Sequence, residues 1–165
     1  MIDTSIDRVH QHGACVARKK RQSIGRSRGG LTSKIHALVD RSGLPIKLAL
    51  TTGEARDNRL AAKLLSRLKS GSMLLADREL RCRLDQRPFR QHGAWANIPP
   101  KRDRTEALSF GLYLYKAPNL VELVFNRIKH CRRVATRYDK LAANYLPFIQ
   151  LASIRLWLRA NESTP

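Results

Sequence analysis

Acidic residues are scarce in this chain of 165 residues. There are 13 Asp and Glu against 32 Lys and Arg, which gives a formal net charge of +19. The basic residues are spread over almost the whole length, and so large a charge would repel itself unless a polyanion bound the protein. The composition therefore predicts a nucleic-acid partner. It does not separate an enzyme acting on nucleic acid from a structural RNA-binding protein.

Cysteine is also scarce. Cys15, Cys82 and Cys131 are far apart and no C-x-x-C motif occurs, which argues against both a disulfide framework and a closed zinc site. His10, His12 and Cys15 are close enough in sequence to suggest zinc ligands. A polar loop is the preferred interpretation, because no second cluster of ligands accompanies them.

Long apolar runs are missing as well. No stretch of about 18 apolar residues occurs, and the N-terminus lacks the apolar core of a signal peptide. We therefore expect a cytoplasmic protein with no membrane partner. Because 42% of the residues are hydrophobic, the chain has enough apolar surface for one folded domain spanning residues 1–165.

The first part of the chain has the patterns of strands. Apolar and polar residues alternate over residues 1–7, which is the period of a strand. Two runs rich in strand formers, residues 31–40 and 46–52, flank the turn-prone residues 41–43. These runs predict a β-hairpin.

A basic segment lies between the first strand and this hairpin. Residues 11–30 are rich in Lys, Arg, Gly and Ser and have no apolar period, which predicts a flexible loop. We expect Arg26 and Arg28, together with Lys34 just beyond the loop, to contact phosphates. A merely solvated loop is the alternative.

The middle of the chain predicts a helix and two short strands. Apolar residues at helical spacing predict a helix over residues 57–69. Residues 73–76 form a continuous apolar run that ends before Asp77, as expected for a strand buried on both faces. Residues 95–98 predict another short strand, which two prolines end.

The strongest period lies in residues 119–140. At helical spacing one face is apolar and another carries a single acid among bases. The apolar face comprises Val121, Val124, Phe125, Ile128 and Cys131, and the other comprises Glu122, Asn126, Lys129 and Arg133. Glu122 either pairs with a neighbouring cation on the helix or is a metal ligand whose partners come from elsewhere. A last amphipathic helix is predicted over residues 142–159.

This order of elements predicts an α/β fold with a mixed sheet flanked by helices, the order of a ribonuclease-H-like fold. In such a fold Asp3 and Asp77 meet at the ends of adjacent strands, and a late helix brings Glu122 to them. Three carboxylates are suitable ligands for a pair of Mg²⁺ or Mn²⁺ ions, which catalyse phosphoryl chemistry. Acids so close together would repel each other without such cations.

Five segments of the sequence carry a resemblance to a known family. They are IDTSIDRVHQHGA at residues 2–14, SIGRSRGGLTSKIHALVD at 23–40, LLADR at 74–78, WANIPPK at 95–101 and VELVFNRIKHCRRVATRYDKLAANYLPFIQLASIRLWL at 121–158. Together they resemble the DDE transposases of bacterial insertion sequences, and within these the insertion sequence five group. The resemblance extends over nearly the whole chain.

The resemblance implies that Asp3, Asp77 and Glu122 are the metal-binding triad of an enzyme that cuts DNA at insertion-sequence ends. The same enzyme would join the 3′ hydroxyls to target DNA. Lys129 matches the family's lysine seven positions after the glutamate, which contacts DNA, and we expect Arg133 to do the same. The expected partner is double-stranded DNA, with self-association of the protein on it.

Two local departures from the family pattern predict low activity. After Asp77 the family usually has Gly-Tyr-Asp, whereas this chain has Glu79, Leu80 and Arg81. Pro118 stands where the family has an arginine, so a cation that would lie near the reacting phosphate is missing. The alternative function is therefore a catalytically degenerate, basic DNA-binding remnant of a transposase.

Full-length relatives also carry an N-terminal region before the first catalytic strand, which helps to recognise the ends of the element. We expect this region to be absent here. The chain then resembles the downstream reading frame of a split gene or a truncated copy, and an upstream-frame product becomes an expected partner.

Overall fold

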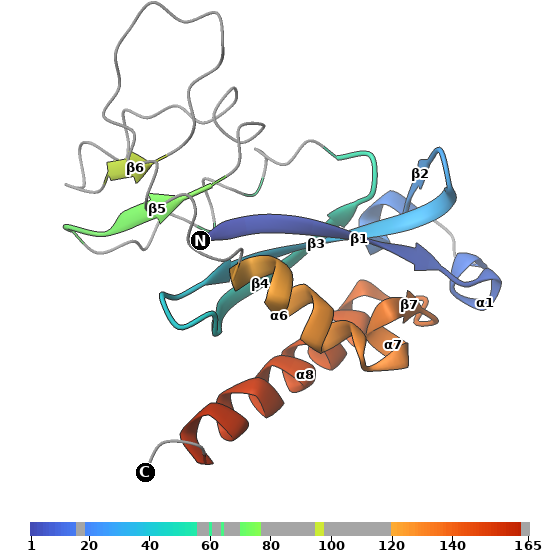
Figure 1. Cartoon of the computed structure of the whole chain (residues 1–165). Coiled ribbons are helices and arrows are strands. Elements are labelled where there is room, and N and C mark those ends of the chain that lie inside the picture. The colour runs from blue at the N-terminus through green and yellow to red at the C-terminus, as the bar shows by residue number, and fades with distance from the viewer. Residues whose placement is uncertain are drawn as a thin grey trace, which may run out of the picture.

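The computed structural model describes residues 1–15, 19–55, 60, 64, 70–76, 95–97 and 120–162. These residues form a mixed α/β structure in which a twisted sheet is covered on one face by helices (Figure 1). In chain order the elements are β1 (Ile2–Val9), α1 (Gln11–Ala14), a 3₁₀ helix (Lys19–Gln22), β2 (Gly25–Ser27), β3 (Gly30–Val39), β4 (Pro45–Thr52), β5 (Met73–Leu75), β6 (Trp95–Asn97), α6 (Leu120–Lys129), α7 (Arg132–Ala135), β7 (Thr136–Arg137) and α8 (Ala142–Glu162).

Strand β3 is the centre of the main sheet. It pairs antiparallel with β1 on one side, from Ile2 opposite Leu38 to Arg8 opposite Thr32. It also pairs antiparallel with β4, and β2 pairs with the beginning of β3. The short β7 lies parallel to the end of β1. The predicted first strand and the predicted hairpin are thus confirmed.

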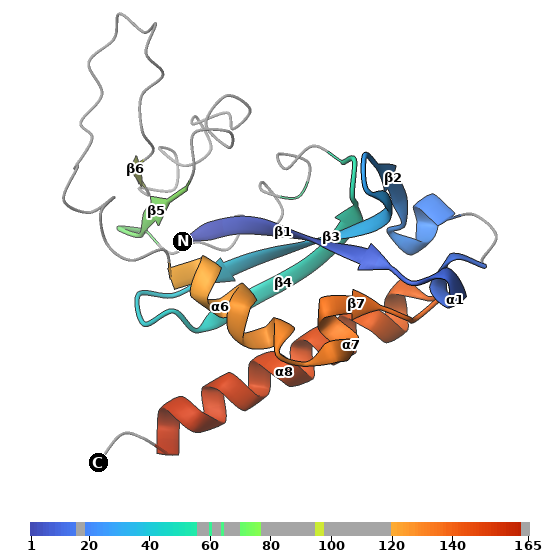
Figure 2. The ribbon, with the colours of Figure 1, turned by 45° about the vertical axis from the view of Figure 1, so that its right-hand side comes forward.

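The hydrophobic core lies between the sheet and the helices. Alternate residues of β3 point to this side, where they meet the apolar faces of α6 and α8 (Figure 2). Its buried members are Ile35, Ala37, Val39, Val121, Val124, Phe125, Ile128, Val134, Tyr145, Ile149, Ala152 and Leu156. The apolar face predicted for the helix that begins near residue 119 is therefore confirmed.

Three polar residues of β1 lie on the same helix-covered face. Asp3 is directly opposite Ala37, Ser5 opposite Ile35 and Asp7 opposite Ser33, and residues directly opposite each other in neighbouring strands share a face of the sheet. The helices thus cover a row of polar side chains on β1 beside the apolar side chains of β3.

Strands β5 and β6 pair with each other in parallel, from Met73 opposite Trp95 to Leu75 opposite Asn97. A parallel bridge between Ile2 and Ala76 joins this pair to β1. The two short strands are confirmed in their described residues, while Ile98 lies outside them. Burial on both faces was the wrong expectation for the first of them, because Leu74 is 1% exposed but Met73 is 38% exposed.

The predicted single helix over residues 119–140 is wrong. Helix α6 ends at Lys129, and after His130 and Cys131 the chain forms the four-residue α7 and then β7. The physical reason lies at the far end: Thr136 pairs with β1 as an extended residue, and a continuous helix would remove that pairing.

The flexible loop predicted for residues 11–30 is also wrong for the residues described. This segment contains α1, the 3₁₀ helix and β2. The side chain of Ile24 is fully buried, and the Ser33 hydroxyl donates to the Ser23 carbonyl at 2.7 Å. These two contacts fix the segment on the sheet.

The predicted helix at residues 142–159 is confirmed as α8. Of the helix predicted over residues 57–69, Leu60 and Leu64 are described, and both are helical. Within the described part of the chain, no helix combines the length and apolar character needed to cross a membrane.

Candidate functional site

Asp3 lies near the start of β1 and is partly buried. The Thr4 backbone N–H donates to its Oδ1 at 2.7 Å, which orients the carboxylate. The preceding residue, Ile2, forms the parallel bridge with Ala76. Asp77, the next residue of the chain after Ala76, lies outside the described residues.

Glu122 lies in the first turn of α6 and is exposed. An acid at this position is stabilised by the helix dipole whatever else it does. The other end of α6 is fixed to β1 through Lys129, whose ammonium lies 2.7 Å from Asp7 Oδ1. The same ammonium donates to the Ser5 hydroxyl at 2.6 Å and to the Ile6 carbonyl at 3.2 Å.

This anchor relates Glu122 to Asp3. Glu122 precedes Lys129 by two helical turns and so shares its helix face, about 10 Å back along the axis. Asp3 precedes Asp7 on the same face of β1, about 13 Å back along the strand. Because α6 and β1 run in the same general direction (Figures 1 and 2), Asp3 and Glu122 lie at the same end of the contact between the two elements.

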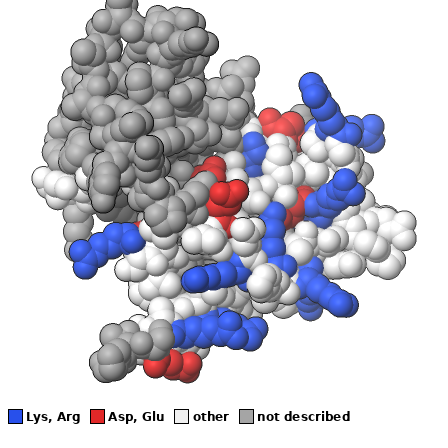
Figure 3. Space-filling model, viewed as in Figure 1, with Lys and Arg blue, Asp and Glu red and all other residues white. Residues whose placement is uncertain are grey.

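Figure 3 shows acidic side chains near the middle of the face seen in Figure 1, with Lys and Arg side chains around them. Within the described residues no group of three or more His, Cys, Asp and Glu is placed to hold a metal ion. Asp77, the remaining acid of the predicted triad, is not among those residues.

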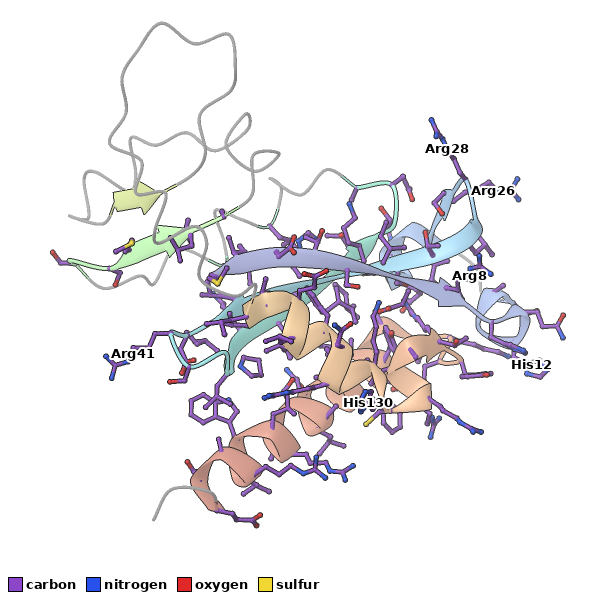
Figure 4. All side chains as sticks on the ribbon, viewed as in Figure 1. Arg8, His12, Arg26, Arg28, Arg41 and His130 are labelled. Carbon is purple, nitrogen blue, oxygen red and sulfur yellow. The ribbon has the colours of Figure 1, made fainter. Side chains whose placement is uncertain are left out.

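The two arginines predicted to contact phosphates in the basic segment are exposed. Arg26 is on β2 and Arg28 is in the turn that follows it. In Figure 4 both lie with Arg8 at one end of the sheet, whereas Arg41 lies at the other end. The protein therefore presents basic side chains beyond the carboxyl end of β1.

The other predicted DNA contacts are placed differently. Lys34 is 8% exposed and its ammonium donates to the Ala55 carbonyl at 2.9 Å. Arg133 belongs to α7 instead of the Glu122 stripe of α6, and its exposed guanidinium lies over the Phe148 ring at 4.2 Å from the centroid. Lys129 makes the contacts with β1 given above. Each of these three residues thus has partners within the protein, and their contacts with DNA stay predictions.

A buried polar network lies beneath the site, and the sequence did not reveal it. Asp7, Arg137 and Tyr145 are each at most 1% exposed. The Tyr145 hydroxyl lies 3.0 Å from Asp7 Oδ2 and 2.7 Å from the Val134 carbonyl. The one available signal was that Asp7 is in phase with Asp3 and Ser5 on β1.

Arg137 connects several segments of the chain. Its guanidinium donates to the Ser33 hydroxyl at 2.7 Å, the Asp139 carbonyl at 2.8 Å and the Lys140 carbonyl at 3.1 Å. Burial lowers the pKa of this guanidinium, and it raises the pKa of the Tyr145 hydroxyl. Both side chains make hydrogen bonds that connect segments of the fold.

Asp7 is the acid of this network. Burial raises the pKa of its carboxyl above the usual range, while the hydrogen bond and charge of Lys129 and the hydrogen bond of Tyr145 oppose the rise. The contacts of Asp7 with Lys129 and Tyr145 explain how an acidic residue is tolerated beneath α6 and α8.

Comparison with known proteins identifies the family of this chain. The family model for the transposase DDE domain matches residues 1–157, and the chain therefore belongs to this family. It is also 34% identical over 134 residues to a Brucella ovis protein named as a candidate transposase for insertion sequence element IS6501. That alignment covers 78% of this chain and 100% of the relative. No solved structure matches the chain.

The resemblance to DDE transposases of insertion sequences is thus confirmed. Domains of this family generally use divalent metal ions and act on DNA, which agrees with the acids at the start of β1 and α6 and with the net charge of +19.

Proposed function

We propose that this chain is the catalytic domain of an insertion-sequence transposase of the insertion sequence five group. It cuts DNA strands at the ends of the element and joins the 3′ hydroxyls to target DNA. The observation that carries the proposal is that the start of β1 forms the bridge from Ile2 to Ala76, while α6 begins on the same side of the sheet near that end of β1 in both views (Figures 1 and 2).

The order of the strands supports a ribonuclease-H-like fold. Pairing gives the order β4, β3, β1 in the main sheet, with β1 antiparallel to β3. The parallel bridge between Ile2 and Ala76 connects β1 to the separate parallel pair β5 and β6. Helices α6 and α8 cover one face of this sheet. We propose one such domain over residues 1–165.

The acids at this end have the chemistry that a hard divalent cation requires. Carboxylate oxygens are the preferred ligands of Mg²⁺ and Mn²⁺, and the Thr4 N–H fixes the orientation of Asp3. Asp3, Asp77 and Glu122 would hold one or two such ions. When bound, these ions activate the attacking oxygen and stabilise the departing 3′ oxygen of the DNA strand.

The remaining residues bind and orient the DNA. Exposed Arg26 and Arg28 contact phosphates at the carboxyl end of β1, and Arg133 extends this surface along α7. Contacts with phosphates position the duplex without reading its sequence. We propose that self-association on DNA or an upstream-frame product contributes to recognition of the element's ends.

Nicking of a supercoiled plasmid in Mn²⁺ tests the function. Nicking by the unaltered chain that is lost in Asp3→Ala and Glu122→Gln, but kept in Glu162→Gln, supports catalysis. Glu162 is an exposed acid at the end of α8 and so controls for the loss of one carboxylate. Nicking that persists in Asp3→Ala would overturn the assignment of the site.

The same assay decides between the enzyme and the degenerate DNA-binding remnant. The remnant is favoured by Pro118 and by Glu79, Leu80 and Arg81, which all lie outside the described residues. A chain that binds duplex DNA but never nicks it would support the remnant. A chain that does not bind DNA would contradict both functions.

A further inference from the structure

The ammonium of Lys129 is held by residues of β1. The ammonium donates to the Ser5 hydroxyl at 2.6 Å and to the Ile6 carbonyl at 3.2 Å. It also forms an ion pair with Asp7, whose Oδ1 lies 2.7 Å away. The Lys129 side chain is 26% exposed and that of Asp7 is 0% exposed. This lysine is therefore built into the contact between α6 and β1.

Asp7 extends this contact to the other helices. Its second oxygen, Oδ2, lies 3.0 Å from the Tyr145 hydroxyl of α8, which in turn lies 2.7 Å from the Val134 carbonyl of α7. One carboxylate on β1 thus makes polar contacts with both α6 and α8, and through Tyr145 it is linked to α7. An acid with this many partners sets where the helices lie along the strand.

The apolar contacts of α6 do not by themselves fix the position of the helix along β1. Val121, Val124, Phe125 and Ile128 face the core, but hydrophobic contact is non-directional and resists separation better than sliding. An ion pair with a buried acid and directed hydrogen bonds has one favourable geometry, and fixing register is the best-attested role of buried polar groups.

We propose that Asp7 and Lys129 are a positioning pair that fixes the register of α6 along β1 and so places Glu122 beside Asp3. This inference rests on the proposed function, because it assigns the pair to the carboxylate site of the transposase. Lys129 follows Glu122 by two helical turns and Asp7 follows Asp3 on the same strand face, so a shift at the pair is transmitted directly to the two acids. An error of about 1 Å at a catalytic site can cost on the order of a hundredfold in rate.

This role differs from a contact between Lys129 and a DNA phosphate. If Lys129 binds DNA, Lys129→Met should weaken DNA binding and lower its salt dependence by about one unit, whereas Asp7→Asn should not. If the pair positions α6, both variants should alter the distance between α6 and β1 in the free protein. DNA affinity measured without metal should stay unchanged.

The register is measured by pulsed electron paramagnetic resonance with spin labels at Arg8→Cys on β1 and Leu123→Cys on α6. Both residues are exposed, and Cys15, Cys82 and Cys131 are replaced by Ser in all samples. We expect Lys129→Met and Asp7→Asn to shift or broaden the distance distribution. The double variant should be no worse than the single variants, because both remove the same interaction. Lys140→Met, which removes an exposed lysine, should leave the distribution unchanged.

The second readout is Mn²⁺ affinity, measured by electron paramagnetic resonance of the free ion. Loss of a residue that orients a metal ligand typically costs about 10–100-fold in affinity, and we expect this loss in Lys129→Met and Asp7→Asn but not in Lys140→Met. Should Lys129→Met not fold, Ser5→Ala provides a milder variant, because it removes one acceptor of the ammonium. We expect Ser5→Ala to cause a smaller loss of Mn²⁺ affinity.

Two results separate this inference from the proposed function. If the unaltered protein has no Mn²⁺ site that depends on Asp3, the proposed function fails, and the label distances still decide whether the pair sets the register. If that site exists but Lys129→Met changes neither the distances nor the Mn²⁺ affinity, the positioning role is overturned and the transposase site stands.

Discussion

Ile2 in β1 and Ala76 after β5 form a parallel β-bridge. This bridge joins the first strand of the chain to Ala76, which comes later in the sequence than both the hairpin and Leu64. Asp3 and Asp77 are the next residues on the two sides of the bridge in the sequence. The pairing of β1 therefore places the residues that precede these two acids side by side.

Binding to duplex DNA should depend steeply on salt. If six or more phosphates are neutralised, affinity should fall on the order of a thousandfold between about 50 and 200 mM salt. Replacing Arg26 and Arg28 by Gln should lower the slope of log K against log salt by about two. Fluorescence anisotropy with a labelled duplex measures this slope.

Arg155→Gln provides the control for this experiment, because Arg155 is an exposed arginine on α8. It should leave the slope nearly unchanged. A slope that Arg26 and Arg28 do not influence would show that the end of the sheet beyond β1 is not a DNA surface.

Lys34→Met distinguishes a framework role from a DNA contact. The ammonium is buried and donates to the Ala55 carbonyl, and an acceptor left without its partner costs about 1–3 kcal/mol. We expect a lower free energy of unfolding in urea and an unchanged salt slope for DNA binding. The opposite pattern would assign Lys34 to the DNA surface.

The free energy of unfolding should carry a pH-dependent contribution from Asp7. Burial raises the pKa of Asp7 in the folded protein above its ordinary value of 3.8, so the folded state holds this proton more tightly than the unfolded state. The resulting stability is fully present below the unfolded pKa and is lost as pH rises through the folded pKa. Asp7→Asn lacks this contribution.

Urea unfolding of both proteins at a series of pH values measures this contribution. The free energy of unfolding of the unaltered protein, relative to that of Asp7→Asn, should fall as pH rises from about 3.5. In Lys129→Met the fall should extend to higher pH, because the cation that opposes the pKa rise is gone. A difference that is constant with pH would contradict the assignment.

Apolar spacing predicted the buried face of α6 correctly, because Val121, Val124, Phe125 and Ile128 all face the core. It did not predict the end of α6 at Lys129. The period continues to Cys131, whereas the end of the helix depends on β7 pairing with β1, a contact between segments remote in sequence. Local spacing carries no information about such pairing.

The alternation in β1 correctly separated two faces but did not show which one the helices cover. Ile6 is 51% exposed, whereas Asp7 is 1% exposed. Asp7 is accommodated because Lys129 and Tyr145 contact it, and both come from the last part of the chain. The same long-range origin explains why the buried network around Arg137 could not be predicted from the sequence.

The most direct measurement of the central claim is Mn²⁺ binding by four proteins: the unaltered chain, Asp3→Asn, Glu122→Gln and the control Glu162→Gln. Loss of a residue that only orients a metal ligand costs about 10–100-fold in affinity, so loss of a ligand itself should cost at least about tenfold. We predict such a loss in Asp3→Asn and in Glu122→Gln, with the control unchanged. Equal Mn²⁺ affinity in all four proteins would contradict a shared metal site at the start of β1 and α6.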